Sequence, residues 1–259
     1  MKAKNILLLF STLFLFTSCP KSEELIEDSV SIEFYNHING TPIVFDSITG
    51  YSEWFNTYSG QTYNVLNLYY LITEIKLTNE NGFVLKNLSD IHFISSDDNN
   101  TNYLFIPEIL SCGEYSNIDF VFGINSEKNI SNSFLDEDFH TQMFWPDFMG
   151  GGYHYMQLDG KYISNNGNES GYNYHAIRAV DSPGPNPTFP QETFFKVDLG
   201  PVNIQKECEI TISMNIANWF EIPNTWDLNE LNQMLMANSD AQILMYQNGQ
   251  NVFNIESVE

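Results

Sequence analysis

The most regular feature of the chain is an alternation of apolar and polar residues with a period of two. It is clearest over residues 207–219, where the apolar positions are Ile210, Ile212, Met214 and Ile216. This period is that of a β-strand that buries one face and exposes the other to water. Shorter patterns of the same kind predict strands over residues 31–37, 66–77, 91–95, 115–124 and 153–159.

Turn and loop signals separate these predicted strands. Asn81-Gly82 is a pair that favours a tight hairpin turn, because both residues tolerate positive φ angles. Polar or proline-rich stretches predict loops over residues 97–100, 165–170 and 181–190.

One helix is predicted over residues 226–237. Leu228, Leu231 and Leu235 form a single apolar stripe there, and Asp227 can cap the first turn. No shift in composition marks a second domain. The pattern therefore predicts a mostly β fold, a single-domain antiparallel β-sandwich over residues 30–259 with one short C-terminal helix.

The N-terminal segment has the pattern of an export signal. Lys2 and Lys4 precede an apolar run over residues 6–16 that is too short to span a bilayer. Residues 15–19 (LFTSC) resemble a bacterial lipobox, in which the cysteine is lipidated. We expect residues 1–18 to be a lipoprotein signal peptide, Cys19 to carry the lipid, and residues 19–29 to form an acidic tether. The expected location is the outer membrane, facing the periplasm or the cell surface.

Acidic residues dominate the charged positions. The chain has 33 acidic and 10 basic residues, with a formal net charge of −23. Such a chain repels phosphate backbones, so we expect no nucleic-acid partner. The acidic runs 97–100 and 136–138 contain oxygen ligands for calcium, but neither has the spacing of a known calcium loop. Solvated loops are the simpler interpretation of both runs.

The cysteines beyond Cys19 form an even pair. Cys112 and Cys208 would lie in an oxidising compartment after export, where a disulfide between them is expected. The alternative is two separate buried thiols.

A set of short motifs extends over nearly the whole chain after the signal segment. They are FYNHINGTPI (34–43), ITEIKL (72–77), GEYSNIDF (113–120), MFW (143–145), LDG (158–160), YH (174–175) and NWF (218–220). In this order they resemble the MbnP-like family. That family comprises periplasmic or surface copper-binding proteins found beside methanobactin operons and widely in Bacteroidetes. The resemblance implies a β-rich fold with a mononuclear copper site.

The resemblance also implies residues for that site. Family members bind Cu(I) through histidines and kynurenine, which a di-haem partner related to cytochrome c peroxidases forms from tryptophan. At the matching motif positions, His37 and His175 are the implied metal ligands and Trp145 is the aromatic residue expected to be oxidised. A second tryptophan that the family often has is absent from residues 146–151.

Other histidines and methionines also have side chains that can bind a metal. Imidazole suits copper, zinc and iron, and thioethers select Cu(I). Met143 and His154 lie near Trp145 in the sequence and are candidate secondary ligands. His154 shares its predicted strand face with Met156 and Leu158, however, which favours a hydrogen-bonded core histidine.

Enzyme motifs are missing from the sequence. It contains no zinc-protease helix motif, nucleophile elbow or phosphate-binding glycine loop, so we expect a binding protein and no enzyme. The leading hypothesis is copper capture or handling outside the cytoplasm. The alternative is a surface lipoprotein without metal, which binds a glycan or a partner on the aromatic residues Trp54, Tyr58, Trp145 and Tyr153.

Overall fold

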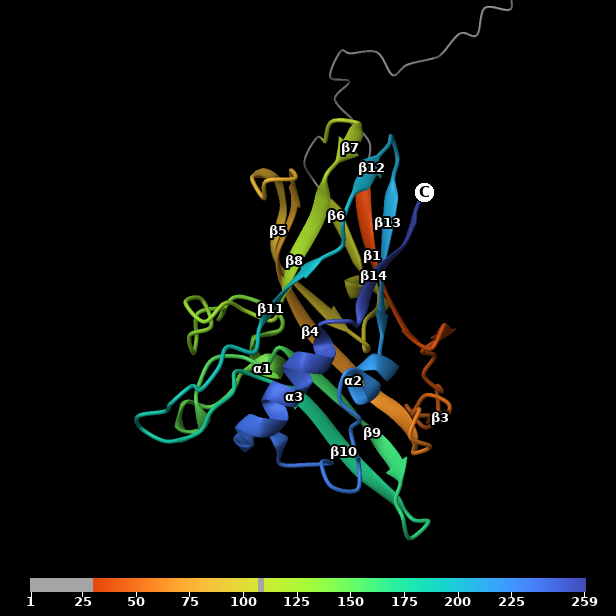
Figure 1. The fold of residues 1–259 in the computed structure, drawn as a ribbon, viewed down its shortest axis with the longest axis vertical. Helices are drawn as coiled ribbons and strands as arrows, with labels where there is room; N and C mark the ends of the chain where they lie inside the picture. Colours follow the sequence, from red (N-terminus) through yellow and green to blue (C-terminus); the bar gives the residue numbers. More distant parts are fainter. Residues whose placement is uncertain (1–29, 107–109) are drawn as a thin grey trace, which may run out of the picture.

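Two β-sheets form the body of the protein in the computed structural model (Figure 1). The structure describes residues 30–106 and 110–259. The predicted signal peptide, the lipidation site at Cys19 and the tether over residues 19–29 lie outside these residues. Within the described part of the chain, no helix is both long and apolar enough to cross a membrane.

The smaller main sheet has five strands in the order β14-β13-β1-β2, with β6 also paired to β1. Its strands are β1 (Val30–Ile38), β2 (Thr41–Pro42), β6 (Tyr103–Ile106), β13 (Glu209–Asn215) and β14 (Phe253–Val258). The predicted strands over 31–37 and 207–219 correspond to β1 and β13. The predicted mostly β sandwich is confirmed. Among the described strands, its antiparallel pairing is wrong only for β1 and β13, which pair in parallel, with Phe34 opposite Ile212. Parallel neighbours need a long connection, and nearly the whole domain lies between these two strands.

The larger sheet has seven strands in the order β10-β9-β4-β8-β11, with β3 and β5 paired to β4. Its strands are β3 (Phe55–Asn56), β4 (Thr62–Thr78), β5 (Val84–Ser95), β8 (Asn117–Phe122), β9 (Met156–Ile163), β10 (Glu169–Ala176) and β11 (Phe195–Asp198). The predicted strands over 66–77, 91–95 and 115–124 are confirmed as β4, β5 and β8. The turn at Asn81-Gly82 is confirmed between β4 and β5, where Gly82 has a φ of +75°. A third, two-stranded sheet joins β7 (Gly113–Tyr115) to β12 (Val202–Ile204).

Aromatic side chains fill the space between the two main sheets. Phe34 of β1 meets Phe120 of β8 with ring centroids 6.4 Å apart, and Phe253 of β14 lies 5.2 Å from Phe120. Trp219 and Phe122 pack in the same core, with their ring centroids 5.2 Å apart. Such rings contribute both buried apolar area and edge-to-face contacts, so they fix how the sheets pack.

The C-terminal helix starts later than the sequence predicts. The structure has turns over most of 226–237, and the helix is α3 (Ser239–Gly249). Leu228 and Leu235 are buried as predicted, but Met234 has a φ of +60°, which stops a continuous helix. The Asp227 side chain also accepts the backbone N–H of Asn229, a local bond that competes with helical hydrogen bonds.

Short helices complete the fold. They are α1 (His140–Met143), α2 (Ala217–Glu221) and the 3-10 turns η1 (Asn99–Asn102), η2 (Asp147–Met149) and η3 (Leu235–Ala237). The loop predicted over 97–100 therefore includes the start of η1, and the proline-rich segment 181–190 is irregular as predicted.

Both cysteines of the described chain are free, so the predicted Cys112–Cys208 disulfide is wrong. Cys208 is buried within the hydrophobic core. Cys112 is partly buried and packs against the edge of that core. Each thiol therefore serves as a small apolar side chain, which is the alternative that the sequence left open.

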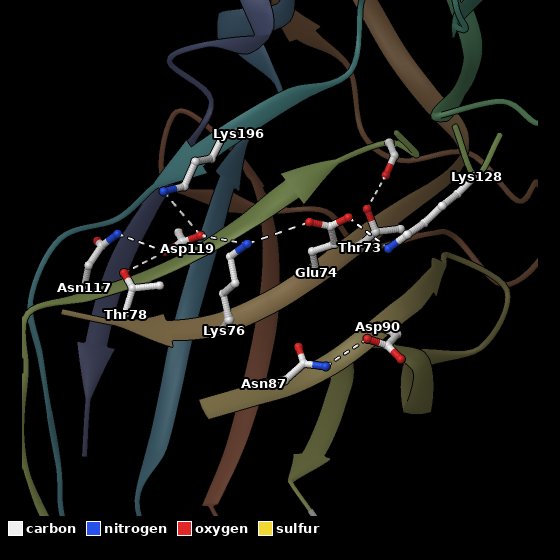
Figure 2. Close-up of polar contacts among 11 residues, drawn as sticks. Thr73, Glu74, Lys76, Thr78, Asn87, Asp90, Asn117, Asp119, Lys128 and Lys196 are labelled. Atoms are coloured by element: carbon white, nitrogen blue, oxygen red, sulfur yellow. Dashed lines mark hydrogen bonds and ion pairs between the residues drawn. The ribbon is translucent and has the colours of Figure 1, made fainter. Parts of the chain in front are cut away.

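A buried carboxylate ties three strands of the larger sheet together (Figure 2). Asp119 of β8 is fully buried, and its Oδ2 accepts hydrogen bonds from Thr78 Oγ1 at 2.9 Å and Asn117 Nδ2 at 3.1 Å. Its Oδ1 lies 3.4 Å from Lys196 Nζ on β11 and 3.9 Å from Lys76 Nζ on β4. The two lysines offset the desolvation free energy of the buried carboxylate. Their attraction to Asp119 links β4 and β11 to β8.

Candidate metal centre

Two imidazole rings meet where β9 and β10 lie side by side. His175 is on β10, and His154 lies in the irregular segment just before β9. Antiparallel pairing places Ala176 opposite Met156, so the end of β10 lies next to the start of β9. The ring centroids of His154 and His175 are 5.3 Å apart, with the planes at 85°.

The His154 ring is buried and held by the backbone. Its Nδ1 lies 3.0 Å from the Met143 carbonyl oxygen, and its own backbone N–H donates to the same oxygen at 2.7 Å. A carbonyl oxygen can only accept, so Nδ1 carries the proton of the ring and Nε2 keeps its lone pair. Nε2 is buried and has no hydrogen-bond partner among the described residues.

The His175 ring is held by a carboxylate. Its Nε2 lies 2.8 Å from Asp159 Oδ1, and Asn173 Nδ2 donates to the same oxygen at 2.6 Å. Burial acts to raise the pKa of Asp159, but the hydrogen bond and the charge of His175 outweigh it, and the pKa falls below its usual value. The ionised carboxylate only accepts, so Nε2 carries the proton. In the neutral form of the ring, Nδ1 of His175 is then the nitrogen with the lone pair, and it too is buried without a partner in the described chain.

Both rings are therefore suited to bind a cation. Burial and, to a smaller extent, the nearby His175 lower the pKa of His154 to about 4. The ring is neutral at physiological pH, which is the form that binds metals. The side chains of His175 and Asp159 are 14% and 17% exposed, so the pair lies close to the surface.

Trp145 lies against the histidine pair. Its ring centroid is 5.1 Å from that of His154, with the planes at 77°, and its indole N–H donates to the Met149 carbonyl at 2.9 Å. Met143 is fully buried in the hydrophobic core, and the atom that it brings to this site is its backbone oxygen. The structure thus gathers four of the five predicted residues: His175, Trp145, Met143 and His154.

Tight backbone turns allow this packing. The Trp145 N–H donates to the Gly152 carbonyl at 2.8 Å, so the glycine run 150–152 folds back beside the tryptophan. Gly152 has a φ of +86°, and a Cβ there would lie 2.5 Å from Asn129 Oδ1. Only glycine combines that backbone angle with so close a neighbour.

His37, the fifth predicted residue, lies elsewhere. It is on β1 in the five-stranded sheet, whereas His175 is in the seven-stranded sheet. Its Nδ1 accepts the Gly40 N–H at 2.8 Å, and its ring stacks on Tyr35 at 5.5 Å. The structure therefore brings His175 together with His154 and gives His37 a role in the β1–β2 turn.

The other candidate sites are less well formed. Within residues 30–106 and 110–259, no three His, Cys, Asp or Glu side chains converge as a metal-binding group. The acidic loop at 97–98 is engaged internally, because Tyr69 donates to Asp97 and the Asp98 carboxylate caps η1. The predicted aromatic platform is divided: Trp54 and Tyr58 are exposed, but Trp145 and Tyr153 are buried.

Comparisons with known proteins point to one family. The MbnP family model matches residues 27–238 of the chain. MbnP from Methylosinus trichosporium is a solved structure with a similar fold, with a TM-score of 0.51 and 12% sequence identity. The match covers 78% of this chain and 79% of that one. No protein with a curated description matches in sequence.

Proposed function

Because this chain belongs to the MbnP family, we propose that it is a copper-binding protein that holds one Cu(I) ion between His154 and His175. The observation that carries the proposal is the pair of buried, unpartnered nitrogens, His154 Nε2 and His175 Nδ1. Such atoms are costly in a folded protein, at about 1–3 kcal/mol each, unless something binds them.

The small number of ligands favours Cu(I) over other metals. A structural zinc site takes four protein ligands, usually Cys and His. Here two imidazole rings lie 5.3 Å apart, and no group of three or more His, Cys, Asp or Glu ligands forms in the described chain. Cu(I) tolerates low coordination and accepts imidazole, so the donor set fits this ion.

Trp145 is the proposed site of oxidation by a di-haem partner. Its ring contacts His154, so a product of its oxidation would lie beside the metal and could supply a further ligand. Both this step and the partner are part of the proposal.

The proposed place of action is the outer membrane. Cys19 would carry the lipid anchor, and residues 19–29 would tether the domain on the periplasmic or outer side. The role there is capture or handling of copper, with no catalytic step by this chain.

The test is metal content by mass spectrometry on protein that starts after Cys19. The wild type, purified from copper-supplemented cells, is expected to contain one copper ion per chain. His154→Ala and His175→Ala should each lose it. His37→Ala is the matched control, because its ring is in the other sheet, and it should retain copper.

The outcomes separate the hypotheses. Copper retained in both His154→Ala and His175→Ala would refute this site, and copper lost in His37→Ala would restore the site implied by the motif positions. A wild type without copper would favour the surface-binding alternative at Trp54 and Tyr58, which are 41% and 94% exposed. Peptide mapping of Trp145 after co-expression with a di-haem partner would detect its oxidation.

A further inference from the structure

The two proposed ligands differ in what holds them. His154 donates its Nδ1–H to a neutral backbone carbonyl, whereas His175 donates its Nε2–H to the carboxylate of Asp159. A hydrogen bond to an ionised acceptor is roughly twice as strong as one between neutral groups. The His175 ring is therefore the more firmly oriented and the more electron-rich of the two.

Asp159 is placed on the sheet so that it can do this. It lies on β9, and the strand register puts it opposite Asn173 of β10, two residues before His175. Asn173 donates to the same oxygen, Oδ1, so the carboxylate is anchored on β10 at two points. The strand itself is fixed at His175, because Gln242 of α3 donates to the His175 carbonyl at 2.8 Å.

The charge at the site also depends on Asp159. Imidazole is neutral when it binds a metal, so a monovalent cation held by the two rings would leave one uncompensated positive charge in a largely buried place. Isolated buried charges are strongly unfavourable. The Asp159 carboxylate is the negative group hydrogen-bonded to His175.

We propose that Asp159 is a positioning residue of the metal centre, which holds His175 with its Nδ1 lone pair free and neutralises the charge of a bound monovalent cation. The inference rests on the proposed copper function. It adds a carboxylate–histidine–metal arrangement, in which the carboxylate does not contact the ion. Partners of this kind typically contribute about 10–100-fold to metal affinity.

The decisive variant is Asp159→Asn, which keeps the size of the side chain and removes its charge. Cu(I) affinity is measured by competition with a chromophoric Cu(I) chelator, and Ag(I) affinity by calorimetry as a redox-inert probe. We expect both affinities to fall about 10–100-fold. Asp90→Asn, the same change at an exposed position on β5, is the control and should leave both affinities unchanged. Asp159→Glu restores the charge and should recover part of the loss.

A second readout is independent of metal and of the variant's folding. Nitrogen-15 NMR of the apo wild type, assigned with His175→Gln, reports which ring nitrogen of His175 carries the proton. We expect a proton on Nε2 and none on Nδ1. A protonated Nδ1 would overturn the inference directly.

The outcomes distinguish the inference from the function on which it rests. If the wild type binds Cu(I) and Asp159→Asn binds it equally well, the role of Asp159 is refuted and the copper site stands. If the wild type binds neither Cu(I) nor Ag(I), both proposals fall together.

Discussion

The imidazole rings of His154 and His175 lie 5.3 Å apart at 85°, and each keeps one buried nitrogen without a hydrogen-bond partner in the described chain. One ring is fixed by a backbone carbonyl and the other by a carboxylate, so the free nitrogens are determined by the acceptors. Proteins seldom leave such atoms without a partner. These two nitrogens are the feature on which the proposed metal centre rests.

Metal binding should stabilise the fold. A ligand that binds only the folded state adds RT ln(1 + [L]/Kd), which is about 2.7 kcal/mol at a hundredfold excess over Kd. We expect Ag(I) to raise the melting temperature of the wild type and of His37→Gln. It should have little effect on His154→Gln or His175→Gln. An equal rise in all four proteins would indicate binding elsewhere.

The apoprotein should lose stability in mild acid. Burial lowers the pKa of His92, so the unfolded chain binds a proton more readily than the folded one. The stability from this residue is complete above the unfolded pKa of about 6.5 and is lost as the pH falls through the folded value. Urea unfolding at pH 7, 6 and 5 should show a falling free energy of unfolding.

His92→Gln isolates this contribution and should flatten the pH dependence in part. His154 supplies a remaining slope, because burial lowers its pKa as well, to about 4. Identical slopes in the wild type and His92→Gln would contradict the assignment to His92.

Removing the buried carboxylate of the larger sheet should be costly. Asp119→Ala leaves Lys76 and Lys196 without their common partner, and Thr78 and Asn117 without their acceptor. Breaking a fully buried pair costs about 3–5 kcal/mol, but both lysines reach solvent, so we expect about 2–4 kcal/mol.

The control for that change is Asp198→Ala. Asp198 lies opposite Asp119 on the neighbouring strand and is exposed, so its loss should cost less than about 0.5 kcal/mol. Chemical denaturation measures both values, and similar losses in the two variants would argue against a special role for Asp119.

Gly152→Ala should weaken both the fold and the metal centre. The new Cβ would lie 2.5 Å from Asn129 Oδ1 at a φ of +86°, and we expect a loss of about 1–3 kcal/mol. Copper affinity should fall too, because the Gly152 carbonyl holds the Trp145 backbone.

Gly167→Ala is the matched comparison for this variant. Gly167 has a φ of +82° with nothing within 4 Å of its Cβ position, so it bears only the cost of the backbone angle. Thermal unfolding should place Gly167→Ala between the wild type and Gly152→Ala. If the two variants are equally stable, the close approach to Asn129 is unimportant.

Much of the sheet structure could be predicted from the alternation of residues. The β13 segment shows why this works, since its apolar positions at 210, 212 and 214 are all fully buried. The prediction that the polar face of this strand is exposed to solvent is wrong at Thr211 and Ser213, which are buried too. Which strands pair, including the parallel β1–β13 pair, depends on long-range packing that a local pattern does not contain.

The helix was misplaced for a chemical reason. The face of α3 that packs against the protein includes Gln242 and Asn248, whose side chains satisfy backbone groups of other segments. Polar residues with such partners can be buried. At buried positions of a helix they interrupt the apolar periodicity on which helix prediction depends. Leu228 and Leu235 of the leucine stripe are buried and Leu231 is partly buried, although this segment does not form an α-helix.

The metal centre was only partly predictable. The motif positions named His175 and Trp145, and the structure places both beside His154. The prediction of a buried, hydrogen-bonded His154 is confirmed, but this residue lies in an irregular segment and β9 begins only at Met156. No sequence signal reports that segment, except the glycine run that precedes it.

The pairing of the first strand of the domain with one near its end bears on how the protein reaches its native state. Val30–Ile38 can complete its hydrogen bonds only after residues 209–215 are available. Contacts so distant in sequence slow folding, because a long loop must close before they form. A chain delivered across a membrane from its N-terminus would therefore emerge almost entirely before the five-stranded sheet could assemble. Until that point the edges of its strands would stay unpaired, which favours aggregation at high concentration.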